Sequence, residues 1–263
     1  MSMIGTVESV WRYPVKSMRG EELAEAFLGF GGVFGDRWYA FCSSKAPKGF
    51  PFLTAREQAK MLLYRPAYRH GGAITRPGNL AQAEALPPGV TPVYPNVGEQ
   101  MLDVETPEGA KLAVDDPALL ESLREGIREQ RELKLIRSDR AMTDCRPISL
   151  FSMQTARQLG EETGVEMDKR RFRANVYLDL GAKSGFSENE FAGRKLQIGG
   201  KTVVVVTDLD PRCKMITLDP DTAQANPEVM KRVARSHDGK AGVYGAVLVE
   251  GTIRPGDAVT VCD

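Results

Sequence analysis

The 263-residue sequence has few histidines and no net charge, and both features exclude classes of protein. Only His70 and His237 occur, so histidine-rich metal sites and most catalytic triads lack the residues they need. Lysine plus arginine and aspartate plus glutamate both total 35, which leaves no overall positive field to attract nucleic acid or anionic membranes. We therefore expect no nucleic-acid partner and no membrane partner, and any anion site has to be local.

Cysteine is also scarce and dispersed. The four cysteines are Cys42, Cys145, Cys213 and Cys262, and they form no Cys-x-x-Cys pair. This spacing argues against a structural zinc site, an iron–sulfur cluster or a disulfide scaffold. The N-terminus carries no charged-then-apolar signal segment, and no run of about 18 apolar residues occurs. Reduced thiols and a cytoplasmic location are the expectation.

The sequence is rich in β-strand patterns instead. Residues 7–30 alternate apolar and polar side chains around a glycine-containing connection, which predicts a meander or barrel. The C-terminal half contains several stretches rich in β-branched residues, the longest of them KTVVVVTDL, and these predict a second sheet or barrel.

Three helices are predicted from their end signals. Asp116 and Asn226 are each followed by proline, the pattern of an N-cap and a first helical residue. The helix after Asp116 is expected to end at residues 129–132. The third helix is expected to begin near Ser152 and to stop at Gly164.

Residues 66–95 resist long regular structure because they hold six of the 16 prolines together with four glycines. Two interpretations remain open. The segment is either an irregular surface loop with a short strand or two, or a lid over a neighbouring site.

The most unusual local pattern is DLDPRCKMITLDPDT, residues 208–222. Cys213 should lie in the loop that leaves the KTVVVVTDL strand, where Arg212 and Lys214 would favour its thiolate. Asp-Pro pairs on both sides predict tight turns that hold the sulfur in place, and Asp210 is interpreted as one of these turn residues. Single cysteines are most often small buried apolar residues, so the local sequence leaves both readings open.

Basic and hydroxyl residues recur in four other short motifs. The motifs are YPVKS with Lys16 and Ser17, GDRW with Arg37, TAR with Thr54 and Arg56, and RRFRAN with Arg171, Arg173 and Asn175. Each alone is typical of a turn or a solvated surface arginine. As a set they supply the donors that a phosphate accepts. Neither GxGxxG nor GxxxxGK[ST] occurs, so an ordinary nucleotide is not indicated.

In order, YPVKS, GDRWYAF, TARE, RRFRANVYLDL and DPRCKMITLDPDT resemble the landmarks of the MOSC proteins, whose name refers to the molybdenum cofactor sulfurase C-terminal domain. The resemblance covers essentially the whole chain and is closest in plan to the mitochondrial amidoxime-reducing component and its bacterial relatives. It implies an α+β fold with a β-barrel-rich MOSC domain at residues 116–263. A second, smaller N-terminal MOSC-associated β-barrel domain at residues 1–115 and a few helices would complete it.

The resemblance further implies a molybdenum cofactor, Mo-molybdopterin, between the two domains, with Cys213 as metal ligand and catalytic residue. The residues that would contact the phosphate end of the pterin are Lys16, Ser17 and Arg37. Those that would line the pterin and metal end are Arg173, Asn175 and Arg212, with Thr54 and Arg56 as further cofactor-binding candidates. A thiolate is a suitable soft ligand for such a metal.

The implied activity is molybdenum-dependent reduction of small N-hydroxylated compounds, such as amidoximes, hydroxylamines and N-hydroxy bases. Because the chain has no flavin or dinucleotide motif, its electrons would come from an external protein of the ferredoxin, flavodoxin or cytochrome type. One alternative is a carrier that delivers the cofactor, or a sulfur held on Cys213 as a persulfide, to another enzyme. Another is a domain kept only for protein contacts.

Three residues depart from the pattern of the family. Lys214 stands where relatives often carry an apolar residue, Ala223 follows DPDT where they usually carry glycine, and Met18 follows YPVKS where they often carry a small residue or cysteine. These departures bear on the substrate contact and on the conformation of the turn, and they leave the cofactor expectation unchanged.

Overall fold

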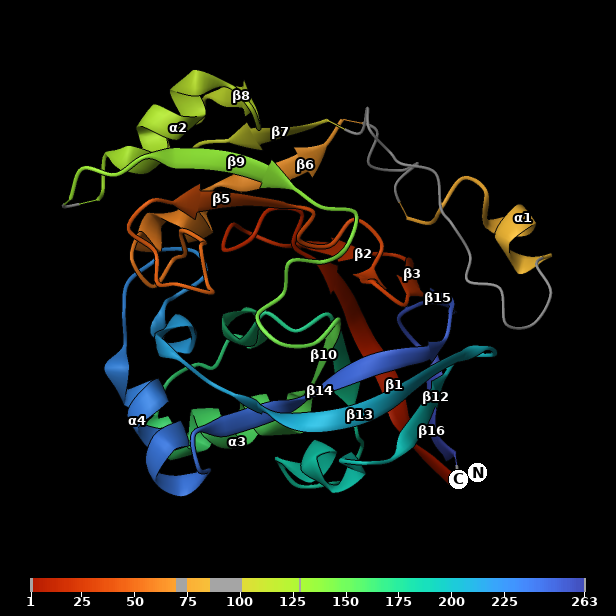
Figure 1. Cartoon of the computed structure of the whole chain (residues 1–263). Helices are drawn as coiled ribbons and strands as arrows, with labels where there is room; N and C mark the ends of the chain where they lie inside the picture. Colours follow the sequence, from red (N-terminus) through yellow and green to blue (C-terminus); the bar gives the residue numbers. More distant parts are fainter. Residues whose placement is uncertain (1, 70–74, 86–100, 128, 263) are drawn as a thin grey trace.

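The structure is a computed structural model that describes residues 2–69, 75–85, 101–127 and 129–262 (Figure 1). Its largest unit is a closed barrel of seven strands in the order β11-β10-β14-β13-β12-β16-β1, closed by pairing of β1 with β11. The strands are β1 (Ser2–Arg12), β10 (Ile148–Ser152), β11 (Val176–Asp179), β12 (Lys195–Ile198), β13 (Thr202–Pro211), β14 (Lys240–Val249) and β16 (Ala258–Cys262). Only β10 and β11 pair in parallel within this ring. The predicted C-terminal barrel is confirmed, but one of its strands, β1, comes from the N-terminal end of the chain.

The barrel forms because its strands present one apolar face to a common interior. On β13, Val204 and Val206 are buried while Val203 and Val205 are half-buried, the alternation that the period of two in a strand requires. Leu150 and Val176 from the facing strands complete the same apolar cluster. Each such side chain contributes roughly 1.5–3 kcal/mol when it is fully buried.

Smaller sheets lie beside the barrel, and two of them enclose a second core (Figure 1). They contain β3 (Ala26–Gly29), β4 (Gly32–Val33) and β15 (Gly251–Ile253) in one sheet, β5 (Tyr39–Ser43) and β9 (Leu133–Arg137) in another, and β6 (Arg65–Tyr68), β7 (Leu102–Glu105) and β8 (Lys111–Ala113) in a third; β2 (Glu21–Leu23) pairs with β1. The sheets β5-β9 and β6-β7-β8 enclose the second core, which is built around Trp38, Phe41 and Leu102, whereas β3, β4 and β15 contribute to the barrel core. This arrangement confirms the α+β class with a smaller N-terminal barrel-like unit.

Strand pairings cross the predicted domain boundary between residues 115 and 116. The barrel takes β1 from before it, β15 pairs with β3, and β9 pairs with β5. The boundary stays a prediction about the sequence, and each of the two cores draws on residues from both sides of it.

The α-helices in the described residues are α1 (Leu80–Glu84), α2 (Pro117–Arg124), α3 (Met153–Thr163) and α4 (Pro227–Ser236). The predicted starts are confirmed, because Asp116, Ser152 and Asn226 each accept a backbone hydrogen bond as N-caps. The predicted stop at Gly164 is also confirmed, with its left-handed φ of 67°.

The predicted end of α2 at residues 129–132 is wrong, because the helix stops at Arg124. The cause is a tertiary contact. Gln58 Nε2 donates a 3.1 Å hydrogen bond to the Leu123 carbonyl, the acceptor that a longer helix would offer to the N–H of Ile127. That N–H turns to the Arg124 carbonyl instead, at 2.9 Å.

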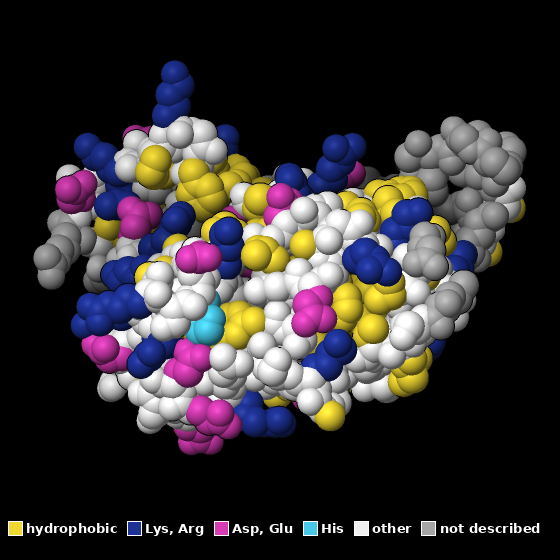
Figure 2. Space-filling view, turned by 90° about the horizontal axis from the view of Figure 1, so that it is seen from below, with side chains coloured by type: hydrophobic (Ala, Val, Ile, Leu, Met, Phe, Trp, Pro, Cys, Tyr) yellow, Lys and Arg dark blue, Asp and Glu magenta, His cyan; other side chains and the backbone are white. Residues whose placement is uncertain are grey.

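Part of the proline- and glycine-rich segment can be placed. Strand β6 and helix α1 lie within or beside residues 66–95, whereas residues 70–74 and 86–95 lie outside the described residues. The choice between loop and lid therefore stays open. In the described ranges, no helix combines the length and apolar character that crossing a bilayer requires. Basic and acidic side chains are interspersed on the face shown in Figure 2, in keeping with the balanced charge of the sequence.

Candidate functional site

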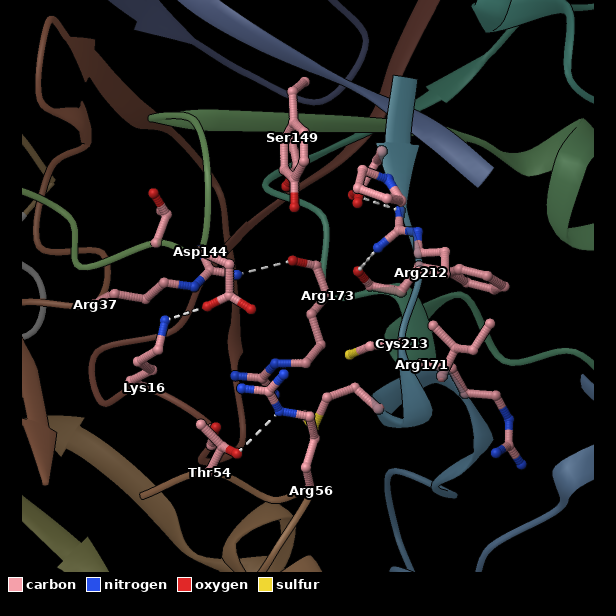
Figure 3. Close-up of a pocket in the computed structure, with 18 of the residues that line it drawn as sticks. Lys16, Arg37, Thr54, Arg56, Asp144, Ser149, Arg171, Arg173, Arg212 and Cys213 are labelled. Carbon is pink, nitrogen blue, oxygen red and sulfur yellow. Dashed lines mark hydrogen bonds and ion pairs between the residues drawn. The ribbon is translucent and has the colours of Figure 1, made fainter. Parts of the chain in front are cut away.

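A cavity lies between the barrel and the N-terminal sheets, and it encloses about 740 Å³ including the part open to solvent (Figure 3). All but one of the predicted site residues line it, namely Lys16, Ser17, Arg37, Thr54, Arg56, Arg173, Arg212 and Cys213. They come from five separate stretches of the chain. The fold thus brings together motifs whose common location the sequence could only suggest.

Asn175 is the exception, since it does not line the cavity. It is 1% exposed and lies one layer behind the wall. Its Oδ1 accepts hydrogen bonds of 3.3 Å from the backbone N–H and the hydroxyl of Ser149, which does line the cavity. Its Nδ2 donates to the Trp11 carbonyl at 3.4 Å. The structure thus corrects its expected place: Asn175 positions a wall residue and joins it to β1.

Lys16 enters the cavity from the turn that follows β1. Its backbone N–H bonds to the Tyr39 carbonyl at 2.8 Å, which joins this turn to β5. The ammonium group is almost fully buried, donates to the Met142 carbonyl at 2.8 Å and pairs with Asp144. Burial lowers the pKa of Lys16, and the carboxylate of Asp144 partly offsets this effect.

The guanidinium groups of two arginines lie over the ring of Tyr13. The guanidinium carbons of Arg37 and Arg173 lie 4.6 and 4.3 Å from the ring centroid. Arg37 also donates to the Arg173 carbonyl at 3.0 Å and pairs with the buried Asp36. Burial opposes the charge of Arg37, but Asp36 raises its pKa above the usual value. The contact of both cations with the aromatic ring stabilises an arrangement that their like charges oppose.

The charge of Arg173 is less neutralised than that of Arg37. Among the described residues no carboxylate lies within ion-pairing distance of it, and its buried Nη2 has no hydrogen-bond acceptor. Burial lowers the pKa of its guanidinium group to about 10. A buried donor without an acceptor is costly unless a ligand supplies one.

The cavity also concentrates left-handed backbone conformations. The non-glycine residues with positive φ include Ser17 at 67°, Arg37 at 47° and Arg173 at 53°. All three line the cavity. Such conformations cost on the order of 1–3 kcal/mol each and persist where the surrounding structure imposes them, often at functional sites.

Cys213 lies directly after β13, as predicted, and caps the short 3-10 helix η5 (Lys214–Thr217). The residue is partly exposed and its sulfur faces the cavity (Figure 3), so the reading as a buried apolar cysteine is wrong. Of the two flanking cations, only Arg212 lines the cavity. Lys214 donates instead to the Arg56 carbonyl at 3.2 Å and so joins the cysteine loop to the N-terminal sheets.

Arg212 is held in a fixed position beside the cysteine. Its guanidinium group donates to the carbonyls of Ala241 at 2.6 Å and Phe172 at 2.9 Å. Its Nη2 lies 2.8 Å from an oxygen of Asp210 as an ion pair, without the alignment of a hydrogen bond. The interpretation of Asp210 as a turn residue is wrong, because β13 runs on to Pro211 and places the carboxyl group in the cavity wall.

Positive charge exceeds negative charge in the wall. The cations are Lys16, Arg37, Arg56, Arg146, Arg171, Arg173 and Arg212, and the carboxylates are Asp144 and Asp210. Buried nitrogens of Arg171, Arg173 and Arg212 lack hydrogen-bond acceptors, but the guanidinium groups of Arg171 and Arg212 form ion pairs with Asp219 and Asp210. With its excess of positive charge and the free donor of Arg173, the site is suited to an anion with several acceptor oxygens.

Sequence reasoning missed several wall residues. Thr143, Asp144 and Arg146 lie on the connection between β9 and β10, where no sequence motif predicted a site. Tyr244 lies within β14, in an alternating pattern that looks purely structural. Asp210, which was interpreted as a turn residue, is different: its position three residues before Cys213 is a sequence signal that could have indicated a place in the site.

Two family models match the chain. Residues 4–115 match the MOSC N-terminal beta barrel domain, and residues 137–260 match the MOSC domain. A segment of 119 residues is 31% identical to the molybdenum cofactor sulfurase of Drosophila grimshawi, covering 43% of this chain and 15% of that protein. The corresponding protein of Drosophila pseudoobscura pseudoobscura is 29% identical over 125 residues, covering 47% and 14%. The chain thus spans a small part of the length of these relatives.

Two solved structures are also similar. The YuaD protein from Bacillus subtilis has a TM-score of 0.48 and 13% sequence identity, with 97% of this chain and 93% of that chain covered. YiiM from Geobacillus stearothermophilus has a TM-score of 0.36 and 22% identity, with 45% and 55% covered.

Proposed function

Because this chain belongs to the MOSC-domain proteins that carry an N-terminal MOSC β-barrel domain, we propose that it holds a molybdenum cofactor in the cavity and reduces N-hydroxylated compounds with it. The likeness to molybdenum cofactor sulfurases relates the chain to the same cofactor. The observation that carries the proposal is the convergence of the Cys213 sulfur with cations from both halves of the chain on one cavity.

The residues present fit such a group. A molybdopterin is anionic through its phosphate and its sulfur atoms, and the wall offers an excess of cations and the buried Nη2 of Arg173, which lacks an acceptor. The Cys213 thiol is the soft ligand type that such a metal accepts. Lys16, Ser17 and Arg37 would hold the phosphate end, and Arg173 and Arg212 the end near the metal.

When bound, the cofactor would supply the two-electron redox chemistry. The residues of the protein would bind and orient the cofactor. The two arginines fixed around Tyr13 would orient the anionic group without moving, because their positions are already set by stacking and by the Asp36 pair. An external ferredoxin, flavodoxin or cytochrome-type protein would supply the electrons.

A second function is favoured by the relatives themselves, which are named as sulfurases. In that case Cys213 would carry a sulfur atom, or the cavity would carry the cofactor, for delivery to another enzyme. A partly exposed cysteine in the wall of a cavity open to solvent is compatible with such a transfer.

The test is turnover by the purified, molybdenum-loaded protein. With reduced methyl viologen as electron source, benzamidoxime should be converted to benzamidine, and Cys213→Ala should abolish the conversion. The matched control is Cys145→Ala, an exposed cysteine outside the cavity wall that should leave turnover unchanged. No turnover by the loaded wild type, together with transfer of cofactor or sulfur to an apo-enzyme, would favour the carrier function instead.

A further inference from the structure

The cavity contains two carboxyl groups in opposite environments. Asp144 lies on an exposed connection, with its side chain 51% exposed and paired with Lys16. Asp210 lies at the end of β13, and only 2% of it is exposed. Both line the same cavity as Cys213. Two carboxyl groups held so differently at one site are suited to different protonation states.

The pKa values of the two carboxyl groups shift in opposite directions. Burial raises the pKa of Asp210, and the ion pair with Arg212 and a hydrogen bond with Tyr244 only partly counter it. For Asp144, burial is outweighed by the attraction and hydrogen bond of Lys16, which hold the pKa of its carboxyl below the usual value. The other charges that act on Asp210 are Asp144, which raises its pKa, and Arg37, which lowers it.

The neighbours of Asp210 fix its carboxyl group from two sides. Arg212 Nη2 lies 2.8 Å from Oδ2, and Arg212 is itself held by two backbone carbonyls. Tyr244 projects from the adjacent strand β14, opposite Asp208 in the ladder, and its hydroxyl bonds to Asp210. The group is thus oriented by rigid strands and not by a mobile loop.

Reduction of an N-hydroxylated compound needs a proton donor at this cavity. The overall change is R–NH–OH + 2 e⁻ + 2 H⁺ → R–NH₂ + H₂O, in which the N–O bond breaks and the oxygen leaves as water. The arginines in the wall cannot act as acids at ordinary pH. The Lys16 ammonium is engaged by Met142 and Asp144, and burial raises the pKa of Tyr244.

We propose that Asp210 is the general acid of the cavity, with its carboxyl group positioned by Arg212 and Tyr244 to protonate the oxygen that leaves the substrate. This inference rests on the proposed function. The carboxyl O–H bond breaks as the O–H bond of water forms, while the electrons come from the donor protein. A second proton reaches the nitrogen from solvent, and solvent then reprotonates the Asp210 carboxylate. Tyr244 is a positioning residue in this scheme.

The protonation state can be measured without cofactor or turnover. Infrared difference spectra of the cofactor-free protein, recorded over a pH titration, should show a carboxyl band that titrates above the ordinary aspartate pKa and that Asp210→Asn removes. Asp208→Asn is the matched control, because this exposed carboxylate lies on the same strand outside the cavity wall, and it should keep the band. Tyr244→Phe should move the titration of the band to higher pH, because the hydrogen bond of Tyr244 lowers the pKa of Asp210. Absence of any band that depends on Asp210 would overturn the proposal.

The loaded protein provides the second measurement. Asp210→Asn should keep its molybdenum and lower turnover by about 10²- to 10⁴-fold, while Asp208→Asn turns over as the wild type does. Tyr244→Phe should extend activity to higher pH, since the acid stays protonated longer. Wild-type turnover by Asp210→Asn would overturn the proposal and leave the proposed function intact. Loss of molybdenum in Asp210→Asn with an unchanged pH profile in Tyr244→Phe would assign Asp210 to cofactor binding instead. An inactive loaded wild type would refute the proposed function, whatever the infrared result.

Discussion

Strand β13 passes through two environments. Its first half places Val204 and Val206 in the apolar interior of the barrel, whereas its end places Asp210 in the wall of the cavity and leads into Cys213. The core cluster of the barrel is built from aliphatic side chains and Phe191, without charged groups. The cavity a few residues further on contains charges, unpaired donors and left-handed backbone.

The difference separates what stabilises the fold from what would perform the chemistry. Burial of aliphatic groups in the barrel supplies stability that does not depend on a ligand. Cavity residues such as Arg173 lower the stability of the free protein, because a buried donor lacks its acceptor and the backbone is strained. Substitutions in the two regions should therefore have opposite effects on stability and on cofactor retention.

The largest expected effect is on the barrel. Leu150→Ala removes a fully buried side chain from the interior cluster and should lower the free energy of unfolding by about 2–5 kcal/mol. The fraction that remains folded should still retain molybdenum, because Leu150 does not line the cavity. Denaturant unfolding and metal content of the folded fraction check both parts. A folded variant without molybdenum would contradict the claim that the barrel core affects stability alone and the cavity affects cofactor retention.

Arg173→Met should have the reverse effect. It removes a half-buried cation that lacks a carboxylate partner while keeping similar volume, so the free energy of unfolding of the cofactor-free protein should rise by about 1–2 kcal/mol. Molybdenum retention should fall sharply. The comparison fails if this variant is less stable and still keeps the metal.

The Lys16–Asp144 pair should give the cavity a pH dependence. Because the pKa of Asp144 in the folded protein lies below its value in the unfolded chain, the pair stabilises the fold above pH about 4 and loses this contribution as the pH falls through the lower folded pKa. Asp144→Asn should therefore lower the free energy of unfolding at neutral pH by at most about 1 kcal/mol, given the exposure of the carboxylate. The gap to the wild type should close in acid. A gap that is equal at pH 7 and pH 2.5 would argue against the pair.

The smallest expected effect lies in the turn after the cysteine loop. Ala223 has a φ of 57°, which glycine adopts freely, so Ala223→Gly should raise the free energy of unfolding by about 0.5–1 kcal/mol. Ala192 has an ordinary φ of −56°, so Ala192→Gly is the matched control and should not stabilise the protein. Thermal unfolding of both variants measures the difference. Equal melting temperatures would show that the turn at Ala223 carries no strain.

Local signals predicted the fold well where the cause is local. The helices after Ser152 and Asn226 begin where their N-caps lie, and Cys213 follows the strand that the valine run predicts. The early end of α2 could not be predicted, because Gln58, which lies far away in the sequence, takes its backbone acceptor. The place of β1 in the C-terminal barrel is a long-range pairing of the same kind.

For the site too, residues in local motifs could be predicted, and residues placed by long-range strand pairing could not. Lys16, Arg37 and Arg173 belong to recognisable motifs, and the structure brings them to one cavity. Asp210 was taken for a turn residue because Asp-Pro is typical of turns, yet the strand continues through the pair. Tyr244 has no sequence signal, because its role depends on the pairing of β14 with β13.

The most direct test of the central claim is the molybdenum content of purified protein, measured by elemental analysis for the wild type, Cys213→Ala and Cys145→Ala. A cavity that holds the metal through Cys213 predicts one molybdenum per chain at most, retained in Cys145→Ala and lost in Cys213→Ala. Equal molybdenum in all three proteins, or none in the wild type purified from molybdate-supplemented cells, would contradict it.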